Sequence, residues 1–214
     1  GLDSQVQEVK SLLELGSDDV VHLVGIHGLV GVDKTTLAVV LYNSIADHFE
    51  GLCFLENVGE TSNKHGLPHL QSNLLSAIVG EKEINLTSVQ QGISIIQHRL
   101  QQKKVLLILD HVDKLEQLQA IIGKPDWFGP GSRIIITTRD KQLLASHGVQ
   151  RTYEMTKLND DDAIQVPSRK SKFKKLDPRC KKVLNQAVDS VMGLPLALEV
   201  SNQGFKFRIR SLKF

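Results

Sequence analysis

The segment Val105–Leu109 is apolar at every position and is followed directly by Asp110. Alternate side chains of a strand point to opposite faces, so a strand of this composition must be covered on both faces. Elsewhere, apolar residues recur every four positions, as at Leu37, Leu41 and Ile45, which is the spacing of a helix packed on a core. Strand and helix candidates alternate along the chain, and the segment 52–58 is a further strand candidate. This alternation predicts an α/β fold with a mainly parallel sheet and helices on each side.

A glycine-containing segment lies between a strand candidate and a helix candidate near the N-terminus. The apolar run 20–26 is followed by Gly28-Leu29-Val30-Gly31-Val32-Asp33-Lys34-Thr35-Thr36. A P-loop has glycine, any four residues, glycine, lysine and then Ser or Thr. Its backbone N–H groups and the start of the helix bind phosphate, and the lysine neutralises the phosphate charge. We therefore predict a P-loop NTPase-type fold. The residues predicted to bind nucleotide in this loop are Gly28, Gly31, Asp33, Lys34, Thr35 and Thr36.

Asp33 occupies the position at which the P-loop pattern has its second glycine. A carboxylate about 4–5 Å from a phosphate costs on the order of a few kcal/mol at an effective dielectric near 20. Such a cost lowers affinity by roughly tens- to thousands-fold. In a second interpretation, the carboxylate fills the anion site at the helix start and stabilises the protein without nucleotide. A third interpretation is a strand–helix turn that binds nothing.

Asp110 and His111 follow the apolar strand candidate. An aspartate in this place is the Walker B arrangement, in which the carboxylate binds Mg²⁺ beside the P-loop threonine. We predict Thr35 and Asp110 as Mg²⁺ ligands; the alternative is an aspartate that caps the next helix, as Asp113 could. His111 stands where many P-loop ATPases carry an acidic residue that orients the attacking water. Histidine accepts protons near neutral pH, but here it has no evident orienting partner. The candidate catalytic residues, for at most a weak Mg²⁺-dependent ATPase, are Lys34, Asp110 and His111.

Arg139 ends a third motif, Gly131-Ser132-Arg133-Ile134-Ile135-Ile136-Thr137-Thr138-Arg139. A strand that ends in Thr-Thr-Arg can place the guanidinium near the γ-phosphate of a nucleotide, where a cation senses its presence. The alternative is a surface arginine that pairs with Asp140 or another neighbour.

The pattern changes after about Glu154 and becomes helical. Asp177-Pro178 is typical of a helix start, and Gly193 is placed to end that helix. Pro195 opens a further short helix. We therefore predict two domains: a P-loop nucleotide-binding α/β domain over residues 1–154, and a small, partial helical subdomain with a divergent tail over residues 155–214.

Charge is unevenly distributed along the chain. The segment 166–214 holds 12 Lys/Arg and 3 Asp/Glu, a net charge of +9, whereas the first 165 residues carry −7. A basic tail can bind nucleic acid. We favour a solvated helical face, or one docked on the acidic part of the same chain, because neither interleaved aromatic residues nor a nucleic-acid motif accompanies the charge.

Other features of the composition indicate a cytoplasmic protein without a membrane segment. No apolar run approaches the roughly 18–20 residues that span a bilayer, and the N-terminus lacks a signal-peptide pattern. The two cysteines, Cys53 and Cys180, are far apart, which excludes a disulfide framework and favours a reducing compartment.

Taken together, the motifs resemble the NB-ARC domain of plant intracellular immune receptors that carry nucleotide-binding and leucine-rich-repeat regions. The matching segments, in order, are the P-loop at 28–36, Phe54-Leu55-Glu56-Asn57-Val58, the Walker B run to Asp113, the motif at 131–139, and Gly193-Leu194-Pro195-Leu196-Ala197-Leu198. The resemblance covers Gly1 to about Val200. The segment 54–58 and Asp113 look like the subclass with an N-terminal TIR domain. Departures from the family pattern include Val30, Asp33, His111 and Gln5.

The resemblance implies an ATP/ADP-operated switch for defence signalling, with ADP in the resting form and ATP in the signalling form. It implies that Arg139 senses the nucleotide and that Pro195 lies against the adenine, which ties the helical subdomain to the ligand. The implied partners are the TIR domain and leucine-rich repeats of a parent receptor, of which this chain is a fragment. Three alternatives to a slow switch remain: a true ATPase, a remnant that binds no nucleotide, and a tail that binds nucleic acid.

Overall fold

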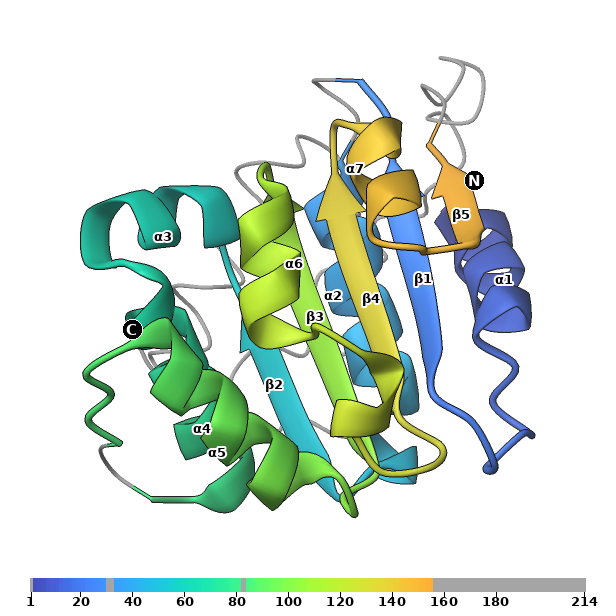
Figure 1. Ribbon diagram of the computed structural model, residues 1–214. Coiled ribbons are helices and arrows are strands. Elements are labelled where there is room, and N and C mark those ends of the chain that lie inside the picture. Colours follow the sequence, from blue (N-terminus) through green and yellow to red (C-terminus); the bar gives the residue numbers. More distant parts are fainter. Residues whose placement is uncertain (1, 30–32, 82–83, 156–214) are drawn as a thin grey trace, which may run out of the picture.

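The computed structural model describes residues 2–29, 33–81 and 84–155. Its centre is a five-stranded sheet in the order β2-β3-β4-β1-β5, in which every pair of neighbours is parallel (Figure 1). The strands are β1 (His22–His27), β2 (Gly51–Leu55), β3 (Val105–Val112), β4 (Arg133–Thr138) and β5 (Arg151–Glu154). The helices are α1 (Leu2–Leu13), α2 (Lys34–Ile45), α3 (Val58–His65), α4 (Leu67–Val79), α5 (Val89–Leu100), α6 (Leu115–Ile121) and α7 (Lys141–Ser146), with short 3₁₀ turns at Ala46–His48 and Pro125–Trp127. The predicted α/β class is confirmed.

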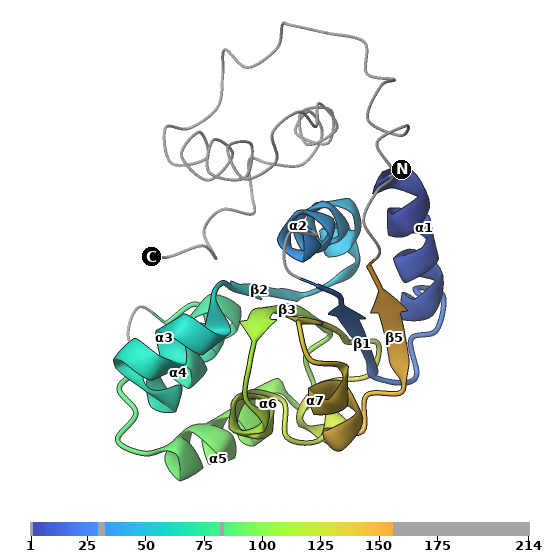
Figure 2. The same cartoon turned by 90° about the horizontal axis from the view of Figure 1, so that it is seen from above.

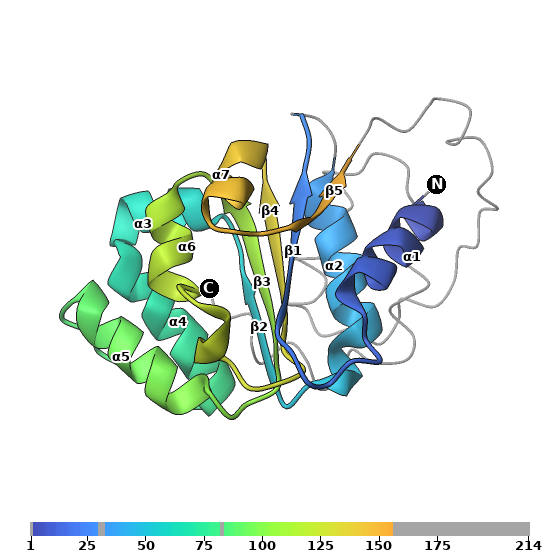
Figure 3. The same ribbon diagram turned by 45° about the vertical axis from the view of Figure 1, so that its right-hand side comes forward.

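Helices cover both faces of the sheet, as the apolar run in β3 requires. α1 and α2 lie on one face, and α3 to α7 lie on the other (Figures 2 and 3). Leu106 and Ile108 of β3 pack in the core that contains α1 and α2. Leu107 and Leu109 pack in the core on the opposite face. Both sets are fully buried, so each face of this strand contributes to a core.

The strand order brings distant segments to one edge of the sheet. β4 lies between β1 and β3, and its last residue, Thr138, is in register with His27 at the end of β1 and with Val112 at the end of β3. The segments that leave β1, β4 and β3 therefore meet at the carboxyl edge of the sheet, where ligands of open parallel sheets bind. Among the described residues, no helix is long and apolar enough to cross a lipid bilayer.

Arg133, at the start of β4, is fully buried and ties α1 to the sheet. Its guanidinium donates hydrogen bonds to five carbonyl oxygens, those of Leu13, Glu14, Ser17, Val20 and Ser132. The first three belong to the last residue of α1 and the turn that follows it. Because carbonyls at a helix end lack partners within the helix, the guanidinium satisfies them and fixes the chain that leads into β1.

The structure differs from the sequence-based expectations at one strand and leaves others untested. The segment 52–58 was predicted as one strand, but β2 ends at Leu55 because Asn57 has left-handed backbone angles and Val58 begins α3. The predicted helix starts at Asp177 and Pro195, the end at Gly193, and the domain boundary at 154/155 fall on or next to residues outside the described ranges.

Candidate functional site

Lys34 is the first residue of α2 and lies at the carboxyl edge of the sheet. Its side chain is only 5% exposed, and its Nζ donates hydrogen bonds to the carbonyl oxygens of Gly28 (2.9 Å) and Leu29 (3.0 Å). Burial, and then the positive charge of Arg139, lower the pKa of Lys34. The ammonium therefore lies against the backbone of the loop that leaves β1, where it can neutralise an anion.

Gly28 is required at the start of this loop. Its φ is +153°, and a Cβ there would lie 2.6 Å from the carbonyl oxygen of Met155. Met155 follows β5, and its N–H donates to the carbonyl of His27 at 2.7 Å, so the loop and the edge strand leave the sheet in close contact. Gly31, the other predicted loop glycine, lies outside the described residues.

Asp33 is the N-cap of α2. Its Oδ1 accepts a hydrogen bond from the backbone N–H of Thr36 at 2.8 Å, and its Oδ2 accepts one from the Thr36 hydroxyl at 2.5 Å. The carboxylate thus lies at the helix start, as the second of the three interpretations of Asp33 expects. The N–H of Thr36 is one of the donors that a helix start offers to a phosphate. Here a side chain of the loop already uses that donor.

Asp110 lies near the end of β3, on the face that α2 covers, and is 2% exposed. The Thr35 hydroxyl donates to its two carboxylate oxygens at 3.0 and 3.1 Å, and the Thr137 hydroxyl donates to its Oδ1 at 2.5 Å. The carboxylate therefore accepts hydrogen bonds from residues of α2 and β4, and it does not cap α6. Asp113 does not cap α6 either: its Oδ1 accepts from the Gln117 side chain at 2.6 Å, and Lys114 is the N-cap.

The pair Thr35–Asp110 suits Mg²⁺. This ion prefers oxygen ligands and commonly takes one or two protein groups together with phosphate oxygens and waters. A threonine hydroxyl and a carboxylate in direct contact are such a pair. No group of three or more His, Cys, Asp or Glu side chains able to hold a metal occurs in the described part of the chain. Any Mg²⁺ held by Thr35 and Asp110 would therefore depend on phosphate and water for its other ligands.

His111 has a direct partner that the sequence analysis did not find. Its Nδ1 lies 2.8 Å from Oδ2 of Asp110, and its backbone N–H donates to Oγ1 of Thr137 at 2.9 Å. The hydrogen bond with Asp110 raises the pKa of His111 in spite of partial burial. The statement that His111 has no orienting partner is therefore wrong. Its φ of 56° turns the ring back toward Asp110, although neighbouring residues of a strand normally point to opposite faces.

Arg139 follows β4 directly and is exposed. Its positive charge lowers the pKa of Lys34, after the larger effect of burial, so the two cations face the same region. Arg139 and Asp140 form no ion pair; the carboxylate of Asp140 accepts the N–H of Gln142 at 2.8 Å as the N-cap of α7. Pro195, predicted to contact adenine, lies outside the described residues.

Glu56 is a further acid at this edge, and it is not among the site residues predicted from the sequence. It follows the last residue of β2, one position beyond the pair Leu55–Leu109 that joins β2 to β3. Burial, and then the negative charge of Asp110, raise the pKa of Glu56. The sequence signal was present: an acid ends the apolar segment before Asn57, as Asp110 ends the run in β3.

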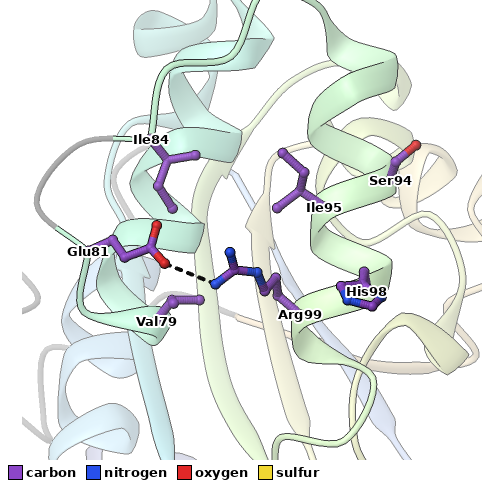
Figure 4. Close-up of a pocket in the computed structure, with 7 residues that line it drawn as sticks. All are labelled: Val79, Glu81, Ile84, Ser94, Ile95, His98 and Arg99. Carbon is purple, nitrogen blue, oxygen red and sulfur yellow. Dashed lines mark hydrogen bonds and ion pairs between the residues drawn. The ribbon is translucent and has the colours of Figure 1, made fainter.

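A hollow of about 370 Å³ lies elsewhere, between the end of α4 and the side of α5 (Figure 4). An ion pair between Glu81 and Arg99, 2.9 Å apart, crosses it. The lining residues are Val79, Glu81, Ile84, Ser94, Ile95, His98 and Arg99. None of them lies at the carboxyl edge of the sheet, so this hollow is separate from the candidate site.

Comparison with protein families identifies the chain. A family model described as the NB-ARC domain matches residues 2–177. The chain belongs to the NB-ARC family. The predicted family is thereby confirmed, and an NB-ARC domain is a nucleotide-binding domain of the P-loop type.

The NB-ARC chain is similar to plant disease resistance proteins. It is 42% identical over 203 residues to disease resistance protein RPV1 of Vitis rotundifolia, covering 94% of this chain and 14% of that protein. It is 38% identical over 208 residues to TMV resistance protein N of Nicotiana glutinosa, covering 94% of this chain and 18% of that protein. The chain thus spans less than a fifth of the length of these two relatives.

A solved structure shows the same fold as the NB-ARC chain. Cdc6p from Pyrobaculum aerophilum superposes with a TM-score of 0.52 at 14% sequence identity, over 75% of this chain and 46% of that chain. At this identity the likeness shows the arrangement of helices and strands alone, and it agrees with the parallel sheet described above.

Proposed function

We propose that this NB-ARC domain binds ADP or ATP with Mg²⁺ and acts as the nucleotide-operated switch module of a cytoplasmic plant immune receptor. The observation that carries the proposal is the convergence of Lys34, Thr35 and Asp110 at the carboxyl edge of the sheet. Lys34 would neutralise the β- and γ-phosphates, and Thr35 with Asp110 would hold the Mg²⁺ that accompanies them. When bound, Mg²⁺ would supply positive charge that screens the phosphate oxygens.

Switching requires contacts that differ between the two nucleotides. Arg139 is suited to this task, because it is exposed at the end of β4 and faces the region of Lys34. A guanidinium there would bind the γ-phosphate of ATP and lose that contact with ADP. In this proposal Pro195 contacts the adenine and so links residues 155–214 to the bound nucleotide. TIR and leucine-rich-repeat domains of a parent receptor would read the resulting change in orientation.

Turnover is expected to be slow. The hydrogen bond to Asp110 raises the pKa of His111 and so favours its protonated form, which cannot accept a proton from water. Asp110 already accepts hydrogen bonds from two threonines. The proposed domain therefore hydrolyses ATP slowly, as a switch requires. The catalytic roles predicted for Lys34, Asp110 and His111 amount to weak hydrolysis at most.

Isothermal titration calorimetry with ADP tests the proposal. The folded wild-type domain, checked by circular dichroism, should release or absorb heat on ADP addition, and Lys34→Ala should weaken binding by at least about tenfold because a buried cation is lost. Absence of binding to the folded wild-type domain would reject the function. ADP found bound to the purified protein would support it independently.

A second candidate is a fold that no longer binds nucleotide, and the capping contact of Asp33 favours it. The carboxylate occupies the N–H of Thr36 and places negative charge at the start of α2. The two candidate functions predict different nucleotide binding for one variant. Replacing Asp33 by glycine restores binding if the rest of the site is intact, and it restores nothing if the site is lost.

A further inference from the structure

Glu56 and Asp110 each follow the last paired residues of the neighbouring strands β2 and β3, at the same edge of the sheet. β2 pairs with β3 in parallel register up to Leu55 and Leu109, and the next residue of each strand is an acid. Neighbouring strands are about 4.8 Å apart. The two acids therefore lie side by side, with Glu56 on the far side of Asp110 from the P-loop strand, as the order β2-β3-β4-β1 requires.

The side chains of Glu56 and Asp110 point to the same face. Phe54 and Ile108, two positions earlier in each strand, both pack in the core beneath α2. Alternate residues of a strand share a face, so Asp110 is expected on the α2 side, where it accepts a hydrogen bond from Thr35 of α2. The same alternation, continued one residue beyond the end of β2, places Glu56 on that side, and the effect of the Asp110 charge on Glu56 agrees with this placement. Both carboxylates thus face the region in which the P-loop would hold phosphate.

A left-handed residue follows each acid directly, at the point where β2 ends and where the register of β3 with β4 shifts before Val112. Asn57 has a φ of 46° and His111 has a φ of 56°. In the described ranges, only one other non-glycine residue, Glu14, has a positive φ. Such conformations are costly, and they gather at functional sites where the surrounding structure maintains them. The repeated turn leaves each carboxylate as the last side chain of its strand on this face.

Within the described ranges, Glu56 differs from its neighbours because its carboxylate has no partner. Asp110 accepts from Thr35 and Thr137 and contacts His111, and the Nδ1 of His111 is engaged by Asp110. The carboxylate of Glu56 forms no hydrogen bond or ion pair with any of the residues that the structure describes. It is half-buried at the carboxyl edge of the sheet, and a carboxylate placed there can accept a proton from a water molecule within hydrogen-bond reach.

We propose that Glu56 is the catalytic carboxylate of this site and takes the proton of the water that attacks the γ-phosphate of bound ATP. The water oxygen forms a bond to the γ-phosphorus, and the bond from that phosphorus to the β,γ-bridging oxygen breaks. Its electron pair stays on the ADP that leaves, and the proton released by the water passes to Glu56 and then to solvent. The inference rests on the proposed function, and it gives to Glu56 the role considered above for His111.

Single-turnover cleavage of ATP with Mg²⁺ tests this inference, after calorimetry has measured ATP binding to each variant. Glu56→Gln should bind ATP at least as tightly as the wild type, because a negative charge is removed, and should cleave it roughly 100-fold or more slowly. Glu56→Asp, which keeps a carboxylate, should retain part of the rate. Glu60→Gln is the matched control: Glu60 is exposed on α3 and pairs with Lys64 at 2.5 Å, so both binding and cleavage should stay unchanged.

Several results would overturn the inference. One is equal cleavage by Glu56→Gln and the wild type. Another is a wild-type domain that binds ATP but leaves it intact over many hours. A third is loss of cleavage in His111→Ala with full cleavage in Glu56→Gln, which would assign the base to His111. A wild-type domain that binds neither nucleotide fails at the calorimetric step, and that result rejects the proposed function together with this inference.

Discussion

The carboxylate of Asp33 accepts hydrogen bonds from both the backbone N–H and the hydroxyl of Thr36, at 2.8 and 2.5 Å. A residue of the loop therefore caps the N-terminus of α2. In a phosphate-binding loop, N–H groups at the helix start face the ligand. A bound phosphate would compete with Asp33 for the same donor, and a phosphate that displaced the carboxylate would lie beside its negative charge.

Replacing Asp33 by glycine removes this competition. We expect the association constant for ADP to rise by at least about tenfold, because the carboxylate–phosphate repulsion of a few kcal/mol disappears. The loss of an aspartate cap to glycine costs α2 only a few tenths of a kcal/mol. Titration calorimetry of Asp33→Gly and the wild type at one salt concentration measures the change.

Ser88→Gly is the control for the loss of a cap. Ser88 caps α5 by accepting the N–H of Gln91 at 3.1 Å, on the face of the sheet opposite α2. This variant should leave ADP affinity unchanged. Equal ADP affinity of Asp33→Gly and the wild type would show that Asp33 does not oppose the nucleotide.

The contact of Thr35 with Asp110 predicts a Mg²⁺-dependent part of ATP affinity. Thr35→Val keeps the shape of the side chain but removes the hydroxyl that lies 3.0 and 3.1 Å from the carboxylate oxygens. It should lower ATP affinity about tenfold in Mg²⁺ and change it little in EDTA, because a ligand of the ion is lost. Thr35→Ser, which keeps the hydroxyl, should behave like the wild type. An equal loss in Mg²⁺ and EDTA would contradict the metal role.

Much of the candidate site could be predicted from the sequence, because its parts depend on local patterns. Thr35 and Asp110 are 75 residues apart. Thr35 lies just before the helical pattern of Leu37, Leu41 and Ile45, and Asp110 directly follows a continuous apolar run. Parallel strands deliver their carboxyl ends to one edge, so the approach of the two residues followed from the fold class. The contact of His111 with Asp110 did not follow. Strand alternation separates neighbours, and only a left-handed residue brings the ring back.

The features that the sequence did not predict depend on distant partners. Arg133 interrupts no local pattern, and its burial depends on carbonyls of the chain more than a hundred residues earlier. The end of β2 was placed too late because Val58 fits the strand pattern as well as the first turn of α3. The role considered for Glu56 depends on the register of β2 with β3, which no spacing along the chain reveals.

Arg133→Met should destabilise the domain strongly. The guanidinium is buried and bonds five carbonyl oxygens, two of them through buried and three through part-buried hydrogen bonds, so its loss leaves these carbonyls without that donor, at a cost of roughly 3–5 kcal/mol. Urea unfolding followed by circular dichroism measures the change. Arg151→Met is the control, because Arg151 bonds the carbonyl of Leu12 and pairs with Glu14 while partly exposed; about 1 kcal/mol or less is expected. Equal effects would contradict the special role of Arg133.

The partly buried His147 should make the domain less stable as the pH falls. Burial lowers the pKa of His147 in the folded protein, so below about pH 6.5 the unfolded chain binds more protons than the folded one. The contribution of His147 to the free energy of unfolding is then fully present above that pH, and it is lost as the pH falls toward the pKa of His147 in the folded protein. Because the raised pKa of His111 acts in the opposite direction, the comparison uses a variant. Between about pH 7 and 5, the urea midpoint of His147→Gln should fall less than that of the wild type, whereas His48→Gln, at an exposed position, should match the wild type.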